Sequence, residues 1–160
     1  MHQFALAQQP TFKKGIPDDL DKEKIIFLEH EPIKLSQFEE KTKSTKYLLQ
    51  RQENHNNVLK ESNTKLKGAA LEYPFEYAIT TPSTYFSLAQ AGYKYVLQSS
   101  VYKYDHLMNQ PPEDELVVFE YFIFDMENNI AYEVFRIDEM KVYDFKLIIK
   151  KLNKAIKAAN

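Results

Sequence analysis

The chain of 160 residues contains no cysteine, no tryptophan and only three glycines. Without cysteine the sequence offers no disulfide, no thiolate metal site, no cysteine nucleophile and no lipid-modified N-terminal cysteine. Because Gly15, Gly68 and Gly92 stand far apart, a glycine-rich phosphate loop, a dinucleotide-binding fingerprint and a G-x-S-x-G elbow are excluded as well. Any chemistry therefore has to come from other residue types.

The sequence also lacks a long apolar run and a strong excess of one charge. Its longest apolar stretch, Leu116 to Phe124, is interrupted by Glu120, whereas a membrane helix needs about 20 apolar residues, so we expect no transmembrane segment. The formal net charge of −2 gives no global attraction to nucleic acid, and we expect no nucleic-acid partner.

The charges that are present are segregated along the chain. Acidic residues dominate positions 111–140, and lysines dominate positions 141–160. Solvated outer faces of packed elements explain this most simply, and a patch for a charged partner is the alternative. Hydrophobic residues make up 44% of the chain, including 11 tyrosines and 11 phenylalanines, so we expect one packed domain with an aromatic core.

The first residues are typical of the end of a secretion signal. Ala5-Leu6-Ala7 places small residues where signal peptidase needs them, which predicts cleavage between Ala7 and Gln8. This interpretation requires a natural start upstream of Met1, and an ordinary frayed terminus is the alternative. Export would place the protein in the periplasm or outside the cell; otherwise we expect it in the cytoplasm. We expect residues 1–7 to be a signal remnant, 8–23 an irregular lead-in and 24–160 one α/β domain.

Hydrophobic periodicity and turn residues predict strands and helices in the order β-α-β-α-β-β-β-α. The box Ser36-x-x-Glu39 predicts the start of a long helix, although Asn54 to Asn57 leave open a kink or break. Ser83 is expected to cap a short second helix. The expected elements are strand 24–30, helix 37–67, strand 73–80, helix 84–91, strand 95–102, hairpin strands 116–125 and 130–137, and an amphipathic helix 145–156.

This order predicts an α/β (α+β) fold with a single mixed β-sheet of about five strands and helices packed on it. The stretch from Ser83 to Val101, with a short helix ending in Ala91-Gly92 and the strand that contains Tyr95-Val96-Leu97, resembles the N-terminal domain of TolB and the CsgG/LpoB group of envelope accessory proteins. The resemblance implies a hairpin with a central aspartate, here Asp125, and a non-enzymatic periplasmic domain that binds a protein partner. It assigns no binding residue.

Candidate chemical groups are few. His2, His30, His55 and His106 are scattered, and no pair has a recognised metal-ligand spacing. Glu29-His30-Glu31 ends the first strand, but neighbours in a strand point to opposite faces and two carboxylates make a weak cation site. We therefore expect no catalytic residue, no metal ligand and no cofactor.

Two further groups have structural interpretations. Asp125 and Glu127 are expected to serve an exposed hairpin turn rather than acid–base chemistry. The tyrosines of the strands, from Tyr73 to Tyr104, are expected to pack in the core, with a stacking platform for bases or sugars as the alternative.

The sequence leaves three functions open. We expect foremost an exported, non-enzymatic accessory or binding domain of the bacterial cell envelope that acts through a protein partner. The alternative is a small-molecule or nucleotide-binding domain, or a hydrolase, with a pocket at the strand ends near His30 and Thr81. A third interpretation is a structural protein whose helix 37–67 pairs with a second copy; the oligomeric state is not predicted.

Overall fold

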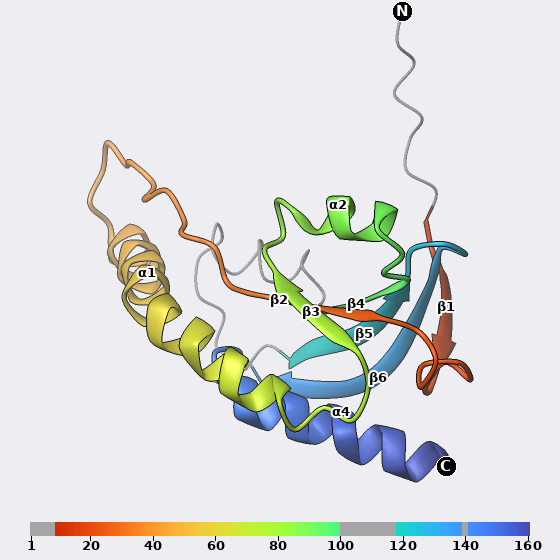
Figure 1. Cartoon of the computed structure of the whole chain (residues 1–160). Coiled ribbons are helices and arrows are strands. Elements are labelled where there is room, and N and C mark those ends of the chain that lie inside the picture. The colour runs from red at the N-terminus through yellow and green to blue at the C-terminus, as the bar shows by residue number, and fades with distance from the viewer. Residues whose placement is uncertain (1–8, 100–117, 139–140) are drawn as a thin grey trace, which may run out of the picture.

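The computed structural model describes residues 9–99, 118–138 and 141–160 (Figure 1). The predicted cleavage site between Ala7 and Gln8 lies outside the described residues. The elements, in chain order, are β1 Thr11–Lys14, β2 Ile25–Leu28, α1 Lys43–Ala70, β3 Tyr77–Thr80, α2 Tyr85–Gln90, β4 Tyr95–Ser99, β5 Val118–Asp125, β6 Ile130–Asp138 and α4 Phe145–Ala159.

The predicted fold class is confirmed, with six strands in one mixed sheet. The strand order is β1-β6-β5-β4-β2-β3. The additional strand, β1, lies in the expected irregular lead-in and pairs in parallel with β6, with Thr11 opposite Ile130. All four of its side chains are exposed, so the strand has no alternation of buried and exposed positions that the sequence could reveal.

Strand directions follow from the connections between the elements. Strands β3 and β4 both pair in parallel with β2, whereas β5 is antiparallel to β4 and forms a hairpin with β6. Helix α1 joins β2 to β3 and lies with α4 on one side of the sheet, and α2 joins β3 to β4 on the other side (Figure 1). None of the helices in the described part of the chain is long and apolar enough to cross a membrane.

The main core lies between the sheet and the two long helices. The predicted amphipathic pattern of α4 is confirmed, because Phe145, Ile148, Ile149, Leu152 and Ile156 are all buried. They pack against strand residues and the end of α1, namely Ile25, Phe27, Leu66, Leu97, Ile123 and Ile137. Tyr73 and Tyr95 are buried here, as expected, and Tyr77 and Tyr93 are half-buried, whereas Tyr102 and Tyr104 lie outside the described residues.

Helix α1 begins six residues later than predicted. Its capping box joins Thr42 and Thr45, each of whose backbone N–H groups donates to the other's hydroxyl oxygen. The predicted box at Ser36 is wrong, because the backbone N–H of Ser36 donates to the side chain of Gln52 instead. The helix runs without interruption through Asn54 to Asn57, so no kink or break forms there.

The hairpin aspartate has the predicted turn role, but it is not exposed. The Asp125 carboxylate accepts hydrogen bonds from the backbone N–H groups of Glu127 and Asn128 and from the Asn128 side chain, at 2.9 to 3.0 Å. Asp125 as a whole is only 2% exposed. Strand β4 pairs beside Asp125, and Lys94, just before β4, brings its Nζ to 4.0 Å from the carboxylate, whereas Glu127 at the tip of the hairpin is exposed as predicted.

Candidate functional site

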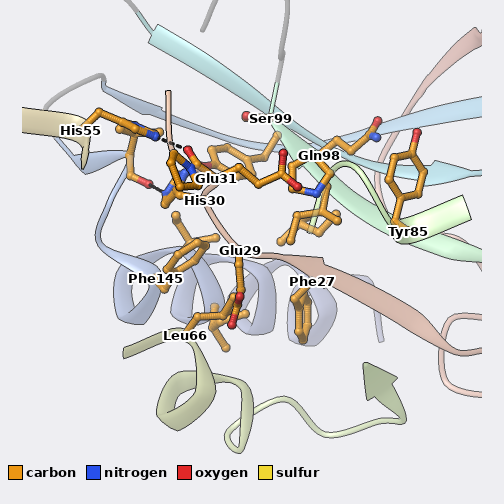
Figure 2. A pocket seen from close by; sticks show the side chains of 18 of the residues that line it. Phe27, Glu29, His30, Glu31, His55, Leu66, Tyr85, Gln98, Ser99 and Phe145 are labelled. Atoms are coloured by element: carbon orange, nitrogen blue, oxygen red, sulfur yellow. Dashed lines mark hydrogen bonds between the residues drawn. The ribbon is translucent and has the colours of Figure 1, made fainter. Parts of the chain in front are cut away.

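A pocket of about 640 Å³ opens at the carboxyl ends of β2 and β4, beside the start of α2 (Figure 2). Its floor is apolar and consists mainly of side chains from the strands and α4, among them Phe27, Leu97, Tyr121, Phe145, Ile148 and Ile149. Polar side chains lie among them or at the rim, among them Glu29, Glu31, Gln98 and Ser99. An apolar cavity with a few polar groups is the usual form of a small-molecule site.

The topology explains why a pocket forms at this edge of the sheet. Strands β2 and β3 are parallel neighbours, so their carboxyl ends lie at the same edge. The chain leaves β2 towards α1 on one face and leaves β3 towards α2 on the opposite face (Figure 1). The two connections diverge and leave a crevice, which is the common ligand position in open α/β sheets.

One wall of the pocket is formed by residues 30–33, the first part of a segment, residues 30–36, that belongs to no helix or strand. Side-chain amides of α1 hold its backbone. Asn63 accepts from the backbone N–H of His30 and donates to its carbonyl oxygen, both at 2.9 Å. Asn56 likewise accepts from the backbone N–H of Ile33 and donates to its carbonyl oxygen, both at 2.8 Å. The segment is therefore held in place as a strand would be, but by helix side chains.

Gln52, one turn before Asn56 on α1, attaches the last residue of this segment. Gln52 accepts from the backbone N–H of Ser36 and donates to its hydroxyl oxygen, both at 2.8 Å. The sequence analysis missed this role of Gln52, Asn56 and Asn63, which we call the amide clamp. Polar residues at helical spacing on an otherwise weakly apolar helix were the signal that could have revealed it.

Two histidines close the pocket next to the amide clamp. His55 Nε2 lies 2.7 Å from the Glu31 carbonyl oxygen (Figure 2), and His55 Nδ1 lies 2.7 Å from the Tyr143 hydroxyl oxygen. Because a carbonyl can only accept, Nε2 carries the hydrogen and Nδ1 accepts from Tyr143. His30 lies with Nε2 3.3 Å from the Val142 carbonyl oxygen, and its ring centre is 5.7 Å from that of His55.

The surroundings keep both imidazoles neutral. Burial, followed by repulsion from His55, lowers the pKa of His30 to about 4. Burial also lowers the pKa of His55, against the opposing effect of its hydrogen bond to the Glu31 carbonyl. At neutral pH the two rings are therefore uncharged parts of the wall. Neither is the imidazolium that acid catalysis by histidine needs.

The side chains of Glu29, His30 and Glu31, at the end of β2, do not converge on one point. Glu29 lies 4.0 Å from Lys67 Nζ, His30 packs against Tyr143 and Phe145, and Glu31 reaches across to the turn before α2. Within residues 9–99, 118–138 and 141–160, no group of three or more acidic or histidine side chains is placed to hold a metal ion.

The turn between β3 and α2 is tied to β2 by Glu31. Its carboxylate oxygen accepts from the backbone N–H of Ser83 at 3.0 Å and from the Ser83 hydroxyl at 2.5 Å. These hydrogen bonds lower the pKa of Glu31. The predicted cap role of Ser83 is wrong, because α2 begins after Thr84, which makes no side-chain cap hydrogen bond. Thr81 lies in this same hydroxyl cluster, next to the pocket-lining Pro82.

Comparison with known proteins does not add to this description. No protein-family model, no curated protein and no solved structure matches the chain.

Proposed function

We propose that the protein binds a small, largely apolar molecule in the pocket at the carboxyl ends of β2 and β4. The observation that carries this proposal is the pocket itself: about 640 Å³ with an apolar floor and a polar rim, at the point where the connections of the sheet diverge. Its volume falls within the range of sites that bury most of a drug-sized ligand.

The polar groups of the pocket favour binding over hydrolysis. A serine nucleophile needs a base that takes its hydrogen in the transition state. Ser83 donates instead to Glu31, a carboxylate whose lowered pKa makes it a weak base. The neighbouring His55 already donates to one backbone carbonyl and accepts from Tyr143. These contacts hold the pocket wall together and provide no activated nucleophile.

An exported accessory domain that acts through a protein partner in the cell envelope stays a prediction from the sequence. Its support is the Ala5-Leu6-Ala7 motif ahead of Gln8 and the resemblance of Ser83 to Val101 to TolB and the CsgG/LpoB group. Binding of a small molecule is compatible with either a periplasmic or a cytoplasmic location. The proposal for the pocket therefore does not depend on export.

Filling the pocket tests the proposal. Ser99 ends β4 and lines the cavity beside Tyr121. We expect the unmodified protein to bind the neutral apolar fluorophore N-phenyl-1-naphthylamine saturably. The substitution Ser99→Phe should weaken binding about tenfold or more, because the new ring occupies the space of the ligand and a loss of about 1.4 kcal/mol is already tenfold. Fluorescence titration measures the affinity, and circular dichroism checks the fold.

Ser87→Phe is the matched control. Ser87 is exposed on α2 and does not line the pocket, so the same change adds an aromatic ring outside it. Dye affinity should stay unchanged in this variant. Absence of saturable binding by the unmodified protein, or equal affinities of the two variants, would contradict the proposal.

A further inference from the structure

We infer that the ligand of the pocket is an amphipathic cation, with an apolar body against the floor and an amine head beside Glu29. The inference rests on the proposed function and adds the chemical class of the ligand. It makes the nucleotide that the sequence left open an unfavourable ligand. Three features of the pocket carry it: the sign of its charges, the occupation of its hydrogen-bond donors, and the weakness of the ion pair at its rim.

The charged side chains of the pocket are acidic. Glu29 and Glu31 both line it, and no lysine or arginine does so among the residues that the structure describes. The two histidines of the wall do not offset this charge, since His30 and His55 are neutral at neutral pH. A cationic head group beside Glu29 is attracted by that carboxylate and, from further away, by Glu31, whereas a phosphate or carboxylate would be repelled by them.

The hydrogen-bond donors of Ser83, just before α2, are already used. At a switch point of an α/β sheet, backbone N–H groups at the start of a following helix commonly bind the phosphate of a ligand. Here the backbone N–H and the hydroxyl of Ser83 donate to the carboxylate of Glu31. The carboxylate of Glu31 therefore takes up two donors that a phosphate at this turn could otherwise use, and it adds a negative charge there.

The cation that now neighbours Glu29 is weakly held. Lys67 Nζ lies 4.0 Å from the Glu29 carboxylate, and the lysine side chain is 70% exposed while that of Glu29 is 22% exposed. Ion pairs at this distance with one solvated partner contribute little to the free energy of folding. An amine that enters with an apolar body can replace the lysine, because its own burial against the floor adds to the attraction.

A series of matched ligands tests the charge preference. Decylamine, decanol and decanoate have the same chain length and differ in the charge of the head group at pH 7. We expect decylamine to displace N-phenyl-1-naphthylamine at about fivefold lower concentration than decanol, and decanoate to be weaker than decanol. One unit charge about 4 Å away in water corresponds to roughly that factor.

Glutamine substitutions test whether these two carboxylates are responsible. The double variant Glu29→Gln with Glu31→Gln keeps the side-chain shape and an acceptor for Ser83, and it should bind decylamine and decanol equally. Glu53→Gln is the control, since Glu53 is an exposed acid of α1 outside the pocket, and its amine preference should match that of the unmodified protein.

The outcomes separate this inference from the proposed function. If dye and all three ligands bind but the amine has no advantage, or decanoate binds best, the inference is overturned and the proposed function stands. An amine preference that survives in the double variant, or that Glu53→Gln removes as well, also overturns it. If neither dye nor decanol binds the unmodified protein, the proposed function itself fails.

Discussion

Acidification from pH 7 to pH 5 should lower the free energy of unfolding by about 2 kcal/mol through His30. Its pKa is about 4 in the folded protein and 6.5 as the ordinary value. Between these values the unfolded chain binds a proton that the folded chain does not. The stability is therefore complete above the unfolded pKa and is lost as the pH falls towards the folded one. His55, with a lowered pKa, acts in the same direction.

Urea denaturation at the two pH values measures this effect. In His30→Gln the loss should be smaller by about the same 2 kcal/mol, because glutamine does not titrate and can still donate to the Val142 carbonyl. The lowered pKa values of Asp19 and Glu31 contribute only below about pH 4.5, outside the measured range. An equal loss of stability in both proteins would show that His30 is not responsible.

Replacement of Asn63 by leucine should lower the free energy of unfolding by about 3 kcal/mol. The Asn63 amide satisfies both the N–H and the carbonyl of His30 in a partly buried position, and leucine can satisfy neither. Since His30 and the residues after it up to Ile33 line the pocket, the same variant should also bind the apolar dye more weakly. Urea denaturation and dye titration measure the two effects.

Asn57→Leu is the control for this variant, because Asn57 is an exposed residue of the same helix that takes no part in the amide clamp. It should change stability by no more than about 0.5 kcal/mol, and leucine's better helix propensity favours a slight gain. Hydrogen exchange gives a second readout, since the His30 amide should lose protection in Asn63→Leu only. Equal destabilisation by both variants would refute the clamp.

The sequence predicted those elements whose side chains carry a clear period. The apolar positions of α4 and the hairpin of β5 and β6 are of this kind, and each was placed within a few residues. Strand β1 was missed because its side chains are all exposed. The start of α1 was misplaced because Ser36 has the local pattern of a cap, yet its backbone is bound by Gln52, which lies 16 residues away.

The candidate site was less predictable than the fold, because its key contacts are long-range. His30 could be placed at a strand end, where α/β proteins often bind ligands, and the pocket includes it. The pairing of Glu31 with Ser83, 52 residues away, and of His30 with Asn63, 33 residues away, depends on how the helices cross the sheet. A residue pattern in one segment cannot specify such partners.

Methyl NMR with decanol as the ligand tests the central claim most directly. If the pocket binds small apolar molecules, saturable shifts should be confined to lining residues such as Leu97, Val142, Ile148 and Ile149. The equally buried methyl groups of Ile26, Val96 and Ile156, which do not line it, should move little. No shift at saturating decanol, or shifts that are as large at Ile26 and Val96 as at Ile148, would contradict a binding site at the ends of β2 and β4.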